Sequence, residues 1–235
     1  DRTSEVDAMR LLKPLEQWTK DDVNQLVADR AREDRFLDYK RNAYRPKDDK
    51  ELCGDVSAFA NADGGHLLLG VDEERDREGR PTGVPSAAPG VSGNIDELTR
   101  HIDQVLRNGS VDPRIPGLRV RAIDGFPNGA VIVIHAPRSW AAPHMVRDSG
   151  RFIVRTTAGN HPMDARELRA SLLLGGESTS LPERFRQERF SAVINGRAPF
   201  PVGDRGTVLL HVGAITALHH GPLPAPAGRR RGGRA

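Results

Sequence analysis

The chain has 235 residues, 37% of them hydrophobic, and a formal net charge of +3. No apolar run approaches the roughly 20 residues of a membrane-spanning helix, and the single cysteine, Cys53, excludes an internal disulfide or a zinc site of several cysteines. A net charge this small is compatible with a nucleic-acid partner without requiring one. Residues 1–5 lack the basic-then-apolar order of a secretory leader, so we expect a cytoplasmic protein.

The first half of the chain alternates between predicted helices and strands. Thr19 is a typical N-cap, and the apolar residues after it predict a helix. Residues 36–41 alternate as in a strand. The stretch ELCGDVSAFANADGGHLLLGVD then predicts an amphipathic helix, a stop at Gly64-Gly65 and an apolar strand that ends at Asp72.

The second half is predicted to contain more strands. Residues 73–93 are expected to form a loop rich in glycine, proline and charge, and Asn94 caps the next helix. The later expected elements are a hairpin of residues 118–123 and 130–135, a second hairpin of 145–146 and 152–155, a helix over 164–174, a charged helix through Phe185, Phe190 and Val193, and an apolar run at 208–212.

These elements predict one main domain of mixed α/β class, with appendages at both ends. The expected parts are a helical lead-in at 1–19, the main domain at 20–175, a helix–strand extension at 176–220 and a disordered basic tail at 221–235.

Three acids and a lysine mark a candidate site in this domain. Side chains alternate along a strand, so Asp38 and Lys40 point to the same face, and Glu33 can reach them from the preceding turn. Asp72, at the end of the neighbouring strand, would add a third carboxylate. Such a group can bind Mg²⁺ or Mn²⁺ through oxygen atoms, and the cation and the lysine can stabilise charge on a phosphate. The alternative is a set of ordinary solvated ion pairs.

At these residues the chain resembles a known family, the Schlafen-type AlbA-like domain. The segments REDRFLDYKR and DVSAFANADGGHLLLGVDE are similar to its two main sequence blocks, and the resemblance extends over roughly residues 20–175. The matching positions are Glu33, Asp38, Tyr39 and Lys40 in the first block, and Ala58, Phe59, Ala60, Asn61, Gly64, Gly65, Gly70, Val71 and Asp72 in the second. The resemblance implies a mixed sheet flanked by helices and a nucleic-acid-binding function.

The resemblance also implies candidate chemistry. Some relatives are metal-dependent endoribonucleases that cut transfer or ribosomal RNA with three acids, which correspond to Glu33, Asp38 and Asp72 here. Asp38 is shorter than the glutamate often found at its position. Other bacterial members act as regulators or phage-defence components without demonstrated cleavage. Two lobes surround RNA in animal relatives, so a homodimer is a further expectation.

A basic surface is predicted from residues around these blocks. Arg151 and Arg155 share a strand face because their separation is even. The candidate nucleic-acid contacts are Lys40, Arg41, Lys47, Arg147, Arg151 and Arg155. Ordinary strand-edge charge or a solvated loop would also explain these residues.

Other polar residues are assigned structural roles. Asn61 is expected to hydrogen-bond around the end of its helix, and His144 to lie in a structural turn. His66 and His135 show no metal-ligand spacing.

The leading hypothesis is therefore an RNA-binding protein with a candidate Mg²⁺- or Mn²⁺-dependent endoribonuclease activity. In it Glu33, Asp38 and Asp72 hold the metal, and Lys40 offsets charge in the transition state. The alternatives are a noncatalytic DNA- or RNA-binding transcriptional regulator and a protein-interaction scaffold of a defence system.

Overall fold

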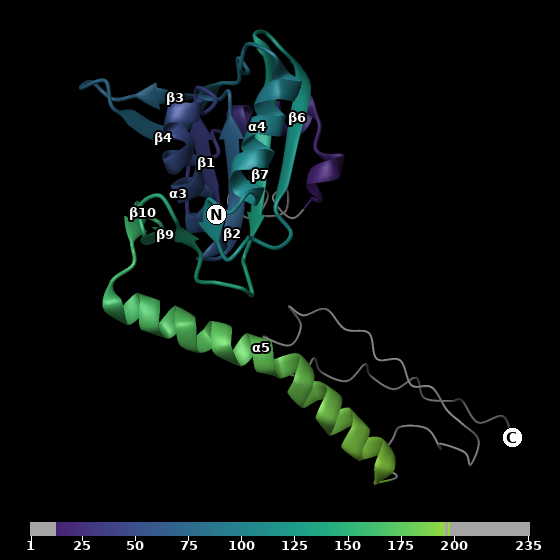
Figure 1. The fold of residues 1–235 in the computed structure, drawn as a ribbon. Coiled ribbons are helices and arrows are strands. Elements are labelled where there is room, and N and C mark those ends of the chain that lie inside the picture. The colour runs from purple at the N-terminus through teal and green to yellow at the C-terminus, as the bar shows by residue number, and fades with distance from the viewer. Residues whose placement is uncertain (1–12, 196, 198–235) are drawn as a thin grey trace, which may run out of the picture. The chain divides into compact units, whose positions relative to one another are not determined.

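The structure, a computed structural model, describes residues 13–195 and 197 of the chain (Figure 1). Its elements, in chain order, are η1 (Leu15–Gln17), α2 (Lys20–Ala28), β1 (Leu37–Lys40), η2 (Pro46–Asp48), α3 (Asp49–Ala60), β2 (Gly64–Leu69), β3 (Asp72–Arg75), β4 (Pro81–Ala87), α4 (Ile95–Arg107), β5 (Val111–Asp112), β6 (Arg119–Phe126), β7 (Gly129–Pro137), β8 (Met145–Val146), β9 (Arg151–Thr156), β10 (Gly159–Pro162) and α5 (Ala165–Ile194). The predicted mixed α/β class is confirmed.

The main sheet has the strand order β1-β2-β7-β6. β1 and β2 are parallel and are joined through α3, whereas β7 pairs antiparallel with both β2 and β6. A parallel pair needs such a crossover, because a tight turn can only reverse the chain. The sequence predicted this β1-α3-β2 unit correctly. It also predicted the hairpin at Asn128-Gly129, where Phe126 pairs with Gly129.

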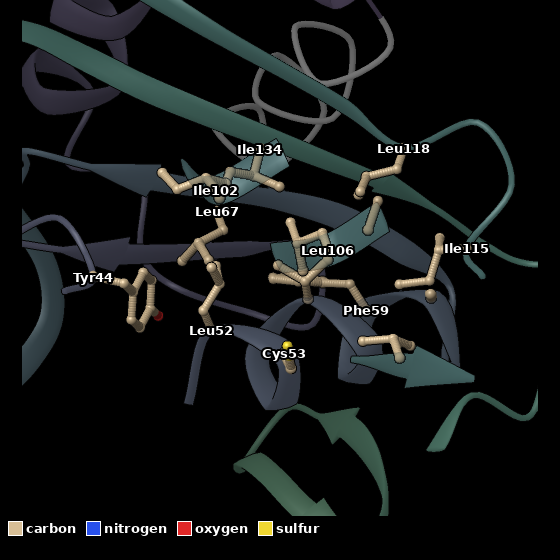
Figure 2. Close-up of a cluster of buried hydrophobic side chains, with 14 of the residues drawn as sticks. Tyr44, Leu52, Cys53, Phe59, Leu67, Ile102, Leu106, Ile115, Leu118 and Ile134 are labelled. Atoms are coloured by element: carbon tan, nitrogen blue, oxygen red, sulfur yellow. The ribbon is translucent and has the colours of Figure 1, made fainter. Parts of the chain in front are cut away.

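Both faces of the main sheet are covered, because alternate residues of its strands enter two separate cores. Leu67, Leu69 and Ile134 pack with α3 and α4 on one face (Figure 2). Leu68 and Val133 pack with η1 and α2 on the other face. Strands buried on both faces become continuously apolar, which explains the Leu67-Leu68-Leu69 run.

A second sheet packs on the far side of α3 and has the order β10-β9-β8-β5. Its central hairpin, β8–β9, was predicted, whereas β5 and β10 were not. α3 therefore lies between the two sheets, which is why seven of its twelve residues are buried. Cys53 is one of them, and burial raises the pKa of its thiol to about 11, as expected for an unreactive packed cysteine.

Two sequence predictions were wrong. The expected loop at 73–93 contains the β3–β4 hairpin, which lacks an apolar alternation because most of its side chains are only half-buried. The two expected helices after residue 164 are one continuous helix, α5, that passes through Gly175 and Gly176. The predicted apolar strand at 208–212 and the basic tail lie outside the described residues.

The chain divides into two compact units, residues 1–172 and 173–235. No helix of the described part is long and apolar enough to cross a membrane.

Two histidines on neighbouring strands of the main sheet lie ring against ring. His66 and His135 are cross-strand partners with ring centroids 4.5 Å apart, and Trp18 stacks on His66 at 4.9 Å. Neither Nδ1 atom has a hydrogen-bond partner within the described structure. Burial, and then the neighbouring His135, lower the pKa of His66 to about 3. The imidazole is therefore neutral in the folded protein at physiological pH.

This stack should make the protein less stable as the pH falls. The unfolded chain binds a proton on His66 near pH 6.5, whereas the folded protein binds it only near pH 3. Stability from His66 is therefore complete above pH 6.5 and is lost progressively towards pH 3, by about 2 kcal/mol at pH 5. Urea unfolding at pH 7 and pH 5 measures the loss in wild type and in His66→Phe.

Wild type should lose more stability between these two pH values than His66→Phe does. Glu33 titrates in the opposite sense, but it is present in both proteins and cancels in the comparison. His161→Ala removes a half-exposed histidine that pairs with Glu167 away from the stack, so it should keep most of the stability loss that wild type shows. If wild type and His66→Phe lost equal stability, the loss between pH 7 and pH 5 would not come from His66.

Candidate functional site

β1 places Asp38 and Lys40 on the sheet face that is covered by α3, opposite to the face that buries Leu37 and Tyr39. The Asp38 carboxylate lies between two cations, with Oδ2 2.9 Å from Lys40 Nζ and Oδ1 3.2 Å from Arg155 Nη2. Asp38 is only 4% exposed. Burial alone would raise its pKa, but Lys40 and Arg155 outweigh that effect and lower it. Asp38 is therefore a buried, ionised carboxylate held by two ion pairs, although its Oδ2 makes no hydrogen bond in the described structure.

Glu33 lies beside Asp38, as the sequence predicted. Its Oε1 accepts a hydrogen bond of 2.6 Å from the backbone N–H of Tyr39, and its carboxyl group shares a hydrogen bond with Asp38. Burial, and then repulsion by Asp38, raise the pKa of Glu33 to about 8. At neutral pH the two acids thus hold one proton and one negative charge between them.

A second buried acid, Asp55 of α3, joins the same network, and the sequence analysis had not identified it. Asn160 of β10 donates a 2.7 Å hydrogen bond to Asp55 Oδ1, and the Tyr44 hydroxyl donates to Oδ2. Lys40 Nζ lies 3.8 Å from Asp55 Oδ2, so its single positive charge is shared between Asp38 and Asp55. The even spacing of Asp38 and Lys40 predicted one half of this network, but nothing local in the sequence pointed to Asp55.

Arg155 was predicted to contact nucleic acid, and this prediction is wrong because the side chain is buried inside the domain. Arg155 is 7% exposed and lies over the Phe59 ring, 4.6 Å from its centroid. Its Nη2 donates to the Leu37 carbonyl at 2.8 Å, and its Nε donates to the Asp34 carbonyl at 2.9 Å. With its bond to Asp38, Arg155 attaches the second sheet to β1. Lys40, largely covered and paired with two acids, is likewise committed to internal contacts.

Asp72 pairs with a different residue and is not part of this network. Its Oδ1 is 3.2 Å from Arg41 Nε, and the two residues line a cavity at the end of β1 and β2. Within residues 13–195 and 197, no three His, Cys, Asp or Glu side chains form a group that could hold a metal ion. The predicted convergence of Glu33, Asp38 and Asp72 on one cation is therefore not present in this arrangement.

The acids also have the wrong partners for a divalent cation. Both oxygens of Asp38 face positively charged side chains, and burial beside Asp38 raises the pKa of the Glu33 carboxyl. A cation would have to displace Lys40 and Arg155 from buried positions. These residues, as arranged, do not fit Mg²⁺ or Mn²⁺.

Two of the predicted basic contacts, Lys47 and Arg151, do come together, and Lys50 lies beside them. Lys47 of η2, Lys50 of α3 and Arg151 of β9 line one groove of about 380 Å³, which we call the basic groove. All three side chains are exposed, and in the described part of the chain Lys47 and Arg151 have no ion-pair partner. The nearest acid to Lys50 is Asp148, 4.0 Å away.

The acids of the basic groove are Asp48 and Glu51, at the start of α3. Negative charge is favourable at a helix N-terminus, so these two acids stabilise α3. Asp48 is also the N-cap residue, and its carboxylate accepts from the Arg45 backbone N–H at 3.3 Å. The remaining predicted contacts, Arg41 and Arg147, are exposed but paired with Asp72 and Asp112.

Asn61 has a larger structural role than the predicted helix-end hydrogen bond. Its side-chain amide donates to the carbonyls of His144 and Ile153 and accepts from the His144 N–H at 2.7 Å. Asn61 thus joins α3 to the loop before β8 and to β9. His144 is fully buried and its Nδ1 lies 2.7 Å from the Pro113 carbonyl, consistent with the predicted structural turn.

The chain matches a known protein family. Residues 33–164, more than half of the chain, match the family described as Schlafen, AlbA_2. The matched range begins at Glu33 and includes the buried network, the basic groove and both sheets. No curated protein matches the chain.

Solved structures show weaker similarity. The DIP2311 protein of Corynebacterium diphtheriae is 19% identical, with a TM-score of 0.41, over 67% of this chain and 30% of that protein. The N-terminal domain of a RecG-related protein of Nitrosomonas europaea is 23% identical, with a TM-score of 0.36, over 48% of this chain and 71% of that domain. The chain thus matches less than a third of the length of the Corynebacterium protein.

Proposed function

This chain belongs to the Schlafen AlbA_2 family, and from that premise we propose that it binds nucleic acid, RNA foremost, through backbone phosphates at the basic groove. The observation that carries the proposal is the convergence of Lys47, Lys50 and Arg151 from three separate elements on one surface depression. Exposed cations without strong partners can contact phosphates and release the counterions that surround a nucleic acid.

The proposal assigns different roles to the two groups of charged residues. Lys40, Asp38 and Arg155 neutralise one another inside the domain and support its fold. Lys47, Lys50 and Arg151 face solvent and supply the attraction to phosphate. Phosphate contacts of this kind give affinity with little sequence information, so the groove should tolerate many sequences. This is the noncatalytic alternative of the sequence analysis. RNA is placed first because the family resemblance includes RNA-cutting relatives.

Fluorescence anisotropy with labelled single-stranded RNA, tRNA and duplex DNA tests the proposal. Binding should weaken steeply between 50 and 200 mM salt. The slope of log K against log salt should be near −2 for single-stranded RNA, because three contacts each contribute about −0.7. Absence of binding to all three probes at the lowest salt would overturn the proposal and favour the protein-interaction scaffold.

Metal-dependent RNA cleavage stays a prediction, and the same probes examine it. Each binding reaction is repeated with EDTA, Mg²⁺ and Mn²⁺ and analysed on a denaturing gel. Intact RNA in every reaction agrees with the noncatalytic proposal. Products that form with Mn²⁺ and disappear in Asp72→Ala would establish cleavage instead. The predicted homodimer is examined by sedimentation of the free protein.

A further inference from the structure

A second depression in the described structure lies outside the basic groove. It has a volume of about 540 Å³ and lies at the carboxyl ends of the parallel strands β1 and β2, so we call it the strand-end cavity. Residues 41–46 leave β1 along one wall, and Asp72 follows β2. In sheets with parallel strands, the crevice beyond the carboxyl ends of the strands is the usual position of a bound ligand, and this volume suits a small molecule.

Charges of both signs line the strand-end cavity. Arg41 and Arg45 contribute guanidinium groups, and Asp72 and Glu97 contribute carboxylates. Arg45 is exposed and has no ion pair within residues 13–195 and 197. Asp72 Oδ1 is covered and makes no hydrogen bond in the described structure, although Arg41 Nε lies 3.2 Å away. A complementary ligand carries an anionic group for the arginines and N–H donors for the carboxylates.

A nucleotide has this combination of groups. Its phosphate suits the planar guanidinium of Arg45, which can bind phosphate through two hydrogen bonds. The amino and ring N–H groups of a base suit a carboxylate acceptor such as Asp72. An inorganic anion would use only the arginines and would leave the acids opposite it without a partner.

The strand-end cavity adjoins the basic groove along η2. Pro46 lines the cavity, and the next residue, Lys47, lines the groove. A strand whose phosphates contact Lys47 can therefore reach the rim of the cavity. We propose that the strand-end cavity binds one nucleoside monophosphate unit, with Arg45 on its phosphate and Asp72 on its base. If the nucleotide in the cavity is part of a bound strand, the inference rests on the proposed function. The other source of the same unit is a free nucleotide.

Isothermal titration calorimetry with AMP, CMP, GMP, UMP and inorganic phosphate tests the cavity by itself. At least one nucleotide should bind tenfold or more tightly than inorganic phosphate. Arg45→Ala should weaken that binding about tenfold, the usual effect of losing one charged hydrogen bond. Arg100→Ala, an exposed arginine of α4 outside the cavity, is the matched control. Unfolding midpoints confirm that both variants fold.

Asp72→Asn gives a second, independent measurement. It replaces a carboxylate acceptor with an amide, so it should change the order of affinity among the four nucleotides rather than weaken all of them equally. Nucleotides that bind no more tightly than inorganic phosphate would overturn the inference. An unchanged affinity in Arg45→Ala would overturn it as well.

Binding of a labelled ten-nucleotide RNA separates the two sources and the two proposals. If Arg45→Ala weakens both the mononucleotide and the RNA, the cavity holds a nucleotide of the bound strand. If it weakens the mononucleotide alone, the cavity holds a free nucleotide. RNA binding without mononucleotide binding would overturn the inference about the strand-end cavity and would leave the proposed role of the basic groove unaffected. Mononucleotide binding without RNA binding would support the inference about the strand-end cavity and would overturn the proposed function.

Discussion

Arg155→Ala should destabilise the first unit of the chain by about 3–5 kcal/mol, the usual effect of removing one partner of a buried ion pair. The substitution leaves the Asp38 carboxylate in a site that is 4% exposed, with only Lys40 to balance it. It also removes the hydrogen bonds that Arg155 donates to the carbonyls of Leu37 and Asp34. Urea unfolding followed by circular dichroism measures the change in the free energy of unfolding.

Arg151→Ala is the matched control for Arg155→Ala. It removes the same side chain from the same strand and the same strand face, but at an exposed position, where substitutions usually change stability by less than about 0.5 kcal/mol. The double variant Asp38→Leu with Arg155→Met should recover much of the lost stability, because apolar residues often replace a buried ion pair without loss. If Arg155→Ala were no more destabilising than Arg151→Ala, Arg155 would not attach the second sheet to β1.

Removing the three cations of the basic groove should weaken RNA binding by roughly a hundredfold. The triple variant Lys47→Ala, Lys50→Ala and Arg151→Ala loses about 1 kcal/mol at each phosphate contact, or about 3 kcal/mol in total. The slope of log K against log salt should become shallower by about 2 units for single-stranded RNA. Anisotropy titrations at three salt concentrations measure both quantities.

The control for the triple variant must change the net charge by the same amount. Arg32→Ala, Arg77→Ala and Arg100→Ala together remove three exposed cations that do not line the groove. This variant should bind RNA within about threefold of wild type. Equal weakening in the two triple variants would show that attraction follows net charge, and the groove would lose its assigned role.

The β1-α3-β2 unit was predictable because its signals are local. A helical apolar period, a Gly-Gly stop and an apolar run each occur within a short window of sequence, and the hairpin at Asn128-Gly129 has its own turn signal. The β3–β4 hairpin gives no such signal. It is held by backbone pairing and by hydrogen bonds such as Gly83 N–H to Glu73 at 2.9 Å. Its residues therefore looked like a polar loop.

The candidate site was predictable only in part, for a related reason. Alternation along a strand placed Asp38 with Lys40 and Arg151 with Arg155, and both pairs of faces are correct. Alternation cannot say what covers a face. Arg155 is buried because Phe59 and β1 lie against it, and both are more than 90 residues away in the sequence. The roles of Asp55 and Asn61 were missed for the same reason.

The stack of Trp18 on His66 gives this protein an intrinsic optical signal. The chain has two tryptophans, Trp18 at 2% exposure and Trp140 at 37%. An aqueous quencher such as iodide reaches the exposed indole and leaves the emission of the buried one. The remaining fluorescence comes from an indole in contact with an imidazole of the main sheet, so it reports the integrity of that sheet without any attached dye.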